Sequence, residues 1–290
     1  MSATAEATAR TSLPLTRRRR PSLLDAIVWE TTKLAAQLRT RATLLFCLIA
    51  PPLIVLILHG QQRPPKDSLF GRYIHESGYA VALLTLGFAA SWVLPLLTAI
   101  VAGDIFASED HHATWKTVLT RSASRTQIFW AKTLTAAGFA ITALLVLAAS
   151  TIVSSILIVG HQPVTGLTGQ LIPSGTAGEL VAASWATALP PLLGFTCFAI
   201  LLSVGSRNAA FGVAAPVVIG LVMVLAGALG GIEAMRPLLL TTPFEAWHGL
   251  LAEHRFYGPF YDGLAVSAGW CLVCLTWAFL ILRRRDFTGD

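Results

Sequence analysis

Six long stretches of this sequence contain no Asp, Glu, Lys or Arg, and this pattern restricts the possible folds more than any other feature. The stretches cover residues 42–59, 79–103, 133–160, 180–203, 208–232 and 263–282. A helix rises about 1.5 Å per residue, so about 20 apolar residues cross a hydrocarbon core about 30 Å thick. Charged residues make up only 12% of the chain, and the mean hydropathy is +0.67. We therefore predict an all-α polytopic membrane protein whose transmembrane domain, residues 42–282, has six helices.

Lys and Arg are unevenly distributed between alternate connecting segments. Sixteen of the 21 basic residues lie before the first stretch, between stretches two and three, between four and five, or after the sixth. Because cytoplasmic loops collect Lys and Arg, both termini are expected in the cytoplasm of a multi-pass protein of the bacterial plasma (inner) membrane. The basic runs at residues 17–20 and 283–285 then face anionic membrane lipid, and the net charge of +6 indicates no nucleic-acid partner.

The segments outside the six stretches have distinct characters. Residues 1–20 predict a disordered basic tail, and residues 283–290 a cytoplasmic tail. Residues 21–41 predict an amphipathic helix along the inner membrane interface, because apolar residues recur at helical spacing and Glu30 and Lys33 form an i, i+3 pair expected to face water. The alternative is that this helix simply extends the first span. The extracellular segment 233–262 is rich in aromatic residues and predicts an interfacial or re-entrant helix.

Prolines and small residues mark features within the spans. Prolines at positions 51, 52, 95, 190, 191 and 216 favour kinks. In the fifth span Gly212 and Gly220 would allow a close backbone approach, either within the chain or between two copies. All four cysteines fall inside spans, so no disulfide framework is expected. The pair Cys271 and Cys274 is interpreted as small packing residues, because no second pair or nearby His completes a metal site.

The cytoplasmic loop 104–132 is too long to be only a connector. Its first half mixes apolar and charged residues, a pattern typical of a short helix that presents one face to another protein. In its second half Arg121 and Arg125 are four residues apart, and Ser122 or Ser124 could cap a helix that runs through Lys132 into the third span. The alternative is that these basic residues only fix the topology.

The order of residues in this loop is specific. Residues 100–106 (Ile-Val-Ala-Gly-Asp-Ile-Phe) lead into Glu109, Thr114, Leu119, Ser122, Arg125 and Lys132. This order resembles the type-2 membrane permeases of ATP-binding-cassette (ABC) exporters, in which an acidic residue, a Gly-Thr pair, a Leu-x-x-Pro-x-x-Arg stretch and a Lys follow one another. Two departures are visible, Ala113 in place of the glycine and Ser122 in place of the proline. The six spans, the N-terminal helix and the extracellular segment before the last span are also similar to that family's plan.

The resemblance implies a permease that pairs with a second permease subunit, identical or homologous, and binds two copies of an ABC ATPase subunit. The loop and the N-terminal helix would contact the ATPases. The residues that carry this role are expected to be Glu109, Thr114, Trp115, Leu119, Arg121, Arg125 and Lys132 in the loop, supported by Glu30 and Lys33. No Gly-x-x-x-x-Gly-Lys-Ser/Thr phosphate loop occurs in the chain, so ATP and magnesium are expected in the partner ATPase. The chain is expected to have no catalytic residue and no metal site.

The uncharged spans suit export of a hydrophobic or amphipathic compound, such as a drug, an antibiotic or a lipid. A secondary transporter or channel without an ATPase partner is the alternative, although such proteins usually embed ionisable residues that these spans lack. A membrane enzyme that uses residues 109–112 (Glu-Asp-His-His) as metal ligands is disfavoured, because neighbouring helical residues point about 100° apart.

Overall fold

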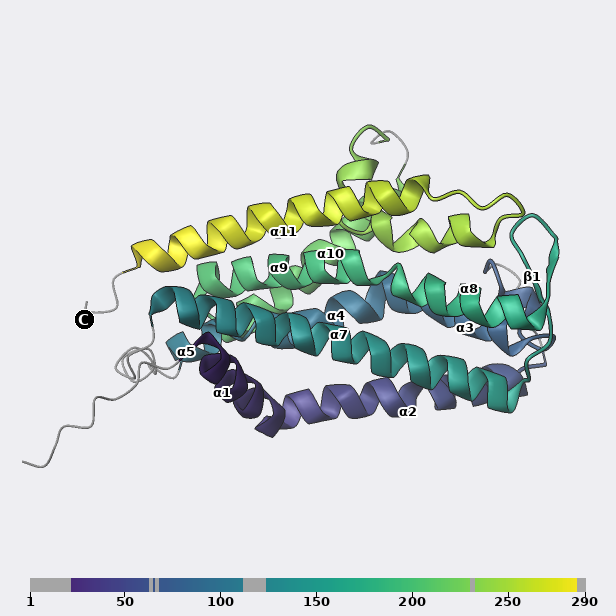
Figure 1. Ribbon diagram of the computed structural model, residues 1–290, viewed down its shortest axis with the longest axis horizontal. Helices are drawn as coiled ribbons and strands as arrows, with labels where there is room; N and C mark the ends of the chain where they lie inside the picture. The colour runs from purple at the N-terminus through teal and green to yellow at the C-terminus, as the bar shows by residue number, and fades with distance from the viewer. Residues whose placement is uncertain (1–21, 63–64, 66–67, 112–123, 230–232, 286–290) are drawn as a thin grey trace, which may run out of the picture.

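Six apolar helical stretches run side by side along the long axis of the molecule (Figure 1). The computed structural model describes residues 22–62, 65, 68–111, 124–229 and 233–285. Within these residues, the stretches long and apolar enough to cross a membrane are Leu38–Gly60, Gly78–Asp110, Arg125–Ile158, Ser174–Ser206, Ala209–Ala228 and Gly258–Arg284. The predicted all-α polytopic fold with six spans is therefore confirmed. The predicted basic tail at residues 1–20 lies outside the described residues.

The chain enters the bundle through a short helix, α1 (Leu23–Ala36), followed by α2 (Leu38–Gly60). A capping box starts α1: Ser22 Oγ accepts a hydrogen bond from the Asp25 backbone N–H at 3.1 Å, and the Asp25 carboxylate accepts one from the Ser22 backbone N–H at 2.8 Å. Gln37 is extended, with φ −75° and ψ 133°, and interrupts the helical hydrogen bonds. The helix expected over residues 21–41 therefore ends at Ala36. Because the ribbon bends sharply here, α1 does not extend the first span (Figure 1).

The second and fourth spans are interrupted helices. The second consists of α3 (Gly78–Phe88), a π-helical turn η2 (Ala89–Val93) and α4 (Leu94–Ala102), followed after a turn by the short helix α5 (Ala107–His111). The fourth is divided into α8 (Ser174–Ala186) and α9 (Leu189–Ser206), with prolines 190 and 191 at the start of α9. By contrast, α2 and α10 (Ala209–Ala228) each continue as one helix through their prolines.

The two ends of the bundle differ. At one end, here called the α1 end, lie α1, α5, the start of α7 (Arg125–Ile158) and the end of α11 (Gly258–Arg284). The opposite end, here called the hairpin end, carries the 3₁₀ turn η1 (Gly71–Tyr73) and an unpredicted antiparallel pair, β1 (Val164–Thr165) and β2 (Leu171–Ile172). The 3₁₀ helices η3 (Arg236–Leu238) and η4 (Thr242–Leu251) form most of the helical structure expected in residues 233–262.

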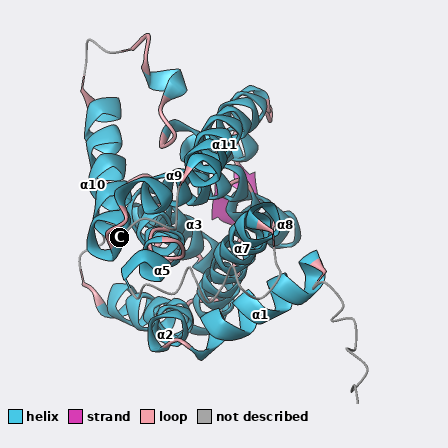
Figure 2. Cartoon of the chain, turned by 90° about the vertical axis from the view of Figure 1, so that its left-hand side faces the viewer, coloured by secondary structure: helices cyan, strands magenta, loops and turns pink. Residues whose placement is uncertain are grey.

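The centre of the bundle is α9, which packs against α11, α10, α4 and α7, whereas α7 packs against α1, α2 and α3 (Figure 2). A close crossing joins α10 to Gly103, the residue that ends α4. A Cβ atom added at Gly103 or at Gly212 would lie 2.1 Å from the other glycine's carbonyl oxygen, so neither position accepts a side chain without movement. A Cβ atom at Gly220 would meet the Phe195 ring at 3.0 Å. The close approach predicted for the fifth span is therefore confirmed, and it occurs within the chain.

Candidate functional site

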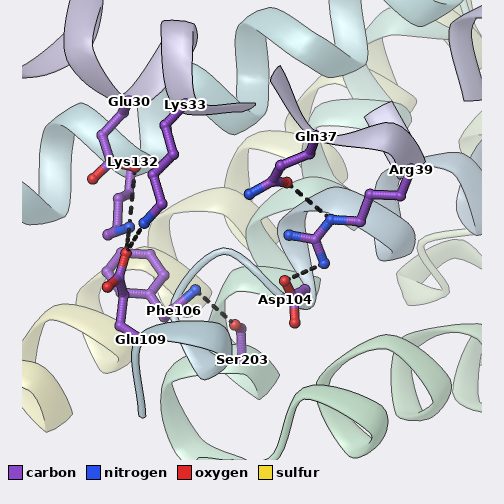
Figure 3. Close-up of polar contacts among 9 residues, drawn as sticks. All are labelled: Glu30, Lys33, Gln37, Arg39, Asp104, Phe106, Glu109, Lys132 and Ser203. Atoms are coloured by element: carbon purple, nitrogen blue, oxygen red, sulfur yellow. Dashed lines mark hydrogen bonds and ion pairs between the residues drawn. The ribbon is translucent and has the colours of Figure 1, made fainter. Parts of the chain in front are cut away.

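The α1 end contains a group of four interacting charged residues, here called the α5 cluster: Glu30 and Lys33 on α1, Glu109 on α5, and Lys132 on α7 (Figure 3). Lys132 Nζ donates to Glu109 Oε1 at 2.9 Å and to Glu30 Oε2 at 3.1 Å. Lys33 Nζ donates to the same Glu109 oxygen. The ammonium of Lys132 also lies 5.9 Å from the Phe106 ring centroid. Three helices distant in sequence are thereby joined by charge.

Most of the α5 cluster is withdrawn from solvent. The side chains of Lys132 and Glu109 are each 1% exposed and that of Glu30 is 6% exposed, whereas Lys33 is 36% exposed. An ionised group that is buried this deeply is tolerated only when it is paired and hydrogen-bonded, and here each has an opposite charge in contact. The expectation that Glu30 and Lys33 face water as a local pair is therefore wrong. Glu30 turns inward to Lys132, and Lys33 reaches Glu109, because two ammonium groups can balance two carboxylates there.

A second ion pair connects the bend after α1 to the end of the second span (Figure 3). Arg39 pairs with the buried Asp104, and Arg39 Nε also donates to Gln37 Oε1 at 2.9 Å. Gln37 is the residue whose extended conformation separates α1 from α2. The pair therefore holds this bend against the segment that leads into α5.

A third contact joins the same region to the last helix. Arg285, which follows α11, pairs with Asp110 of α5 at 3.0 Å. Burial lowers the pKa of Arg285, and the neighbouring Asp110 carboxylate opposes that shift. Arg125 Nη1 donates to the carbonyl oxygens of Arg283 and Arg285 at 3.0 and 2.8 Å. The start of α7, the end of α11 and α5 are thus linked.

A serine from the fourth span completes the fixation of this region. Ser203 of α9 is fully buried, and its Oγ accepts hydrogen bonds from the backbone N–H groups of Phe106 and Ala107, at 3.2 and 3.1 Å. These N–H groups lie at the start of α5, where the first turn of a helix has no partners of its own. Apolar side chains surround the contact, among them Ile105, Phe129 and Ile200.

The sequence-predicted residues fall into three groups. Glu30, Lys33, Glu109 and Lys132 meet in the α5 cluster, and Arg125 lies beside the end of α11. Thr114, Trp115, Leu119 and Arg121 lie outside the described residues. The expected cap of the third span is present: Ser124 Oγ accepts a hydrogen bond from the Gln127 backbone N–H at 3.1 Å. The coupling role of all these residues stays a prediction.

Sequence reasoning missed four participants: Arg39, Asp104, Ser203 and Arg285. Asp104 borders an uncharged stretch, and Arg39 was expected only as a charge of the helix over residues 21–41. Arg285 was expected to face anionic lipid with the run 283–285, but its side chain is buried and pairs with Asp110. A buried serine gives no such signal. Among the residues that the structure describes, no group of His, Cys, Asp and Glu is arranged to hold a metal ion.

The hairpin end contains a cavity of about 430 Å³ between α3, η2, α10 and η4. Its apolar lining includes Phe88, Trp92 and Phe244. Its charged lining residues are Arg236, which pairs with Glu245 at 3.6 Å, and Glu245 itself. Wide, mostly apolar cavities with a few polar groups are typical of sites for small organic ligands.

His248 of η4 also lines this cavity, and its ring lies 4.1 Å from that of Trp247, measured between centroids. Burial lowers the pKa of His248, while Glu245 opposes the shift. The cavity lining therefore combines aromatic rings, an ion pair and a histidine whose neutral form is favoured.

The fold and the six apolar stretches define a multi-pass, helical membrane protein. Residues 26–227 match a family model described as an ABC-2 family transporter protein, and this match covers more than half of the chain. The chain therefore belongs to the ABC-2 transporter permease family, whose members are transport subunits and not themselves catalytic. No curated protein matches the chain.

Proposed function

We propose that this permease forms the translocation pathway of an ATP-driven exporter and couples it, through α5 and the segment after it, to a separate ABC ATPase. The observation that carries the proposal is the set of contacts at the α1 end. Asp104, Glu109 and Asp110 bond to basic residues beside the α1–α2 bend, on α1 and α7, and after α11. A force applied at α5 therefore reaches several spans at once.

The burial of the α5 cluster refines the role of each residue. Glu109 and Lys132 are too deeply buried to form the contact surface for another protein. They instead position α5 through their ion pair inside the bundle. Direct contact with the ATPase falls to residues 112–123, including Thr114, Trp115, Leu119 and Arg121. Glu30 and Lys33 on α1 hold the α5 cluster from the side.

The remaining parts of the proposal follow from the family and the charge distribution. ATP and magnesium bind in the partner ATPase, of which two copies serve a pair of permease subunits, identical or homologous. The α1 end, which is rich in Lys and Arg, faces the cytoplasm of a bacterial cell, and both termini lie there. Helix α1 lies along the inner membrane interface, with exposed apolar residues such as Leu24 and Val28 toward the lipid.

The exported compound is hydrophobic or amphipathic, such as a drug, an antibiotic or a lipid. The 430 Å³ cavity supports this class, because its aromatic walls suit an apolar body and Arg236 and Glu245 suit a polar group. An accumulation assay over a panel of such compounds tests it, by comparing cells that lack the permease with complemented cells. Equal accumulation of every compound would count against efflux.

Co-purification tests the coupling proposal directly. The tagged chain is extracted from its native membrane in mild detergent, and we expect an ATPase of about 250 to 330 residues, two domains' worth of chain, to accompany it. The double variant Glu109→Ala, Arg125→Ala should lose this ATPase. The matched control Glu253→Ala, Arg255→Ala makes the same change in charge at exposed positions near the hairpin end and should retain it. If no protein with a phosphate-binding loop accompanies the wild-type chain, a secondary transporter becomes the better explanation.

A further inference from the structure

Ser203 occupies an unusual position between the coupling region and the core of the bundle. It is fully buried near the C-terminal end of α9, and its hydroxyl oxygen accepts two hydrogen bonds from successive backbone N–H groups, those of Phe106 and Ala107 (Figure 3 shows the first). The ion pairs of Asp104, Glu109 and Asp110 lead to other elements: the start of α2, α1 and α7, and the residue after α11. The bond to Ser203 leads to α9.

The geometry of this contact suits the transfer of movement. On the α5 side the two bonds end on main-chain atoms, so no side-chain rotamer of residues 106 and 107 can absorb a displacement of α5. The neighbouring residues Phe106 and Ile200 are buried in one apolar cluster with Phe129 of α7. Close-packed interiors of this kind transmit strain because they contain little free volume.

Helix α9 extends from Ser203 to a contact with Phe244, one of the residues that line the 430 Å³ cavity. Two turns along, the ring of Phe195 lies 6.0 Å from that of Phe244, measured between centroids, and Phe244 lines the cavity. At the adjacent position, a Cβ atom added at Gly194 would lie 2.6 Å from the Leu240 side chain, so α9 lies close to the segment that leads into η4. A continuous set of contacts therefore runs from α5 through α9 to η4.

We propose that Ser203 is a positioning residue that links the movement of α5 to α9, and through Phe195 and Phe244 to the cavity at the hairpin end. This inference rests on the proposed coupling function of α5. It assigns the transfer of movement to one hydroxyl group in the fourth span. Loss of that group should leave ATPase binding intact and should separate the movement of α5 from that of α9.

Hydrogen–deuterium exchange of the purified permease–ATPase complex tests the proposal, with and without trapping by Mg-ATP and vanadate. In the wild type, trapping should change the exchange of residues 104–111, 199–206 and 242–251 together. In Ser203→Ala the change at 104–111 should persist, and the changes at 199–206 and 242–251 should be lost. A merely structural role would shift exchange equally in both states and leave the trapping-induced difference unaltered.

Three variants serve as controls. Ser203→Thr keeps the hydroxyl and should restore the response, and Ser203→Cys offers a weaker acceptor of similar size if the alanine variant does not fold. Ser206→Ala removes a hydroxyl one turn further along α9 that bonds to Asn208 and not to α5, so the response should remain. A full response at residues 199–206 in Ser203→Ala, or in Ser203→Cys if the alanine variant does not fold, would overturn the proposal.

A second arm needs no ATPase and separates this inference from the proposed function. In the permease alone, Glu109→Gln weakens the ion pairs that hold α5, and this should raise exchange at residues 199–206. The same substitution in a Ser203→Ala background should have no further effect there. If no ATPase accompanies the wild-type chain, the proposed function fails and this arm alone decides. Equal effects of Glu109→Gln in both backgrounds would refute the link.

Discussion

Replacing Lys132 by methionine should destabilise the permease far more than the same replacement at Lys33. Both ammonium groups contact Glu109, but the side chain of Lys132 is 1% exposed and that of Lys33 is 36% exposed. Lys132→Met leaves the buried Glu30 without its ammonium partner. Breaking a buried pair by removing one partner costs about 3 to 5 kcal/mol, and we take about 3 kcal/mol because Lys33 still neutralises Glu109. A partly exposed pair contributes about 0 to 1 kcal/mol, which sets the expectation for Lys33→Met.

Thermal unfolding in detergent, followed by tryptophan fluorescence, measures the difference. About 1 kcal/mol shifts the melting temperature by about 2 to 4 °C in chains of this size range, so Lys132→Met should lower it by about 6 to 12 °C. Adding Glu30→Gln removes the unpaired carboxylate and leaves Glu109 with Lys33, so it should recover a large part of the loss. Melting temperatures for Lys132→Met and Lys33→Met within about 2 °C of each other would refute the reasoning from burial.

Three further substitutions and a change of pH test other parts of the structure. Gly212→Ala should cost about 1 to 3 kcal/mol or more in unfolding free energy, because its Cβ atom would lie 2.1 Å from the Gly103 carbonyl oxygen. Gly138→Ala, with nothing within 4 Å of the added atom, should instead stabilise α7 by up to about 1 kcal/mol. Ser124→Ala should cost about 1 kcal/mol and raise amide exchange in the first turn of α7. The lowered pKa of His248 means that the unfolded chain binds more protons as the pH falls below 6.5, so stability and exchange protection of η4 should decrease there.

Each of these has a result that would contradict it. Equal melting temperatures for the two glycine variants would show that α4 and α10 can separate freely. Unchanged exchange at the start of α7 in Ser124→Ala would mean that packing alone fixes that end. For His248, the comparison runs from about pH 7.5 to about pH 5.5 against His248→Gln, and a loss of η4 protection that is identical in both proteins would assign the effect to another group.

The number of spans was predictable because a charge inside lipid is costly, and uncharged stretches of sufficient length are therefore visible in the sequence. The cap of α7 was predictable for a local reason, since Ser124 and Gln127 are three residues apart. The end of α1 was missed by five residues. Nothing in the composition of residues 34–41 breaks a helix, and the bend coincides with a long-range contact, the pairing of Arg39 with Asp104.

The α5 cluster was predictable only as a set of residues. Glu30, Glu109 and Lys132 could be named from the sequence, but their partners could not, because Lys132 and Glu30 are 102 positions apart. The nearer neighbour, Lys33, was the expected partner of Glu30, since i, i+3 pairs stabilise isolated helices. Tertiary packing overrides that local preference once the carboxylate is buried. Ser203 shows the wider limit, because nothing in its own sequence neighbourhood reveals that it meets residues 106 and 107.

The spans of this permease differ greatly in length, and this has a consequence for the surrounding lipid. Helix α10 has 20 residues and measures about 30 Å, which equals the thickness of a hydrocarbon core. Helix α7 has 34 residues and measures about 51 Å, so about 20 Å of it must tilt or stand outside that core. No single bilayer thickness fits both helices. A thinner or thicker membrane would therefore change the tilt of α7 relative to α10. Membrane thickness would thus shift the first turns of α7, where Lys132 lies and pairs with Glu30 and Glu109.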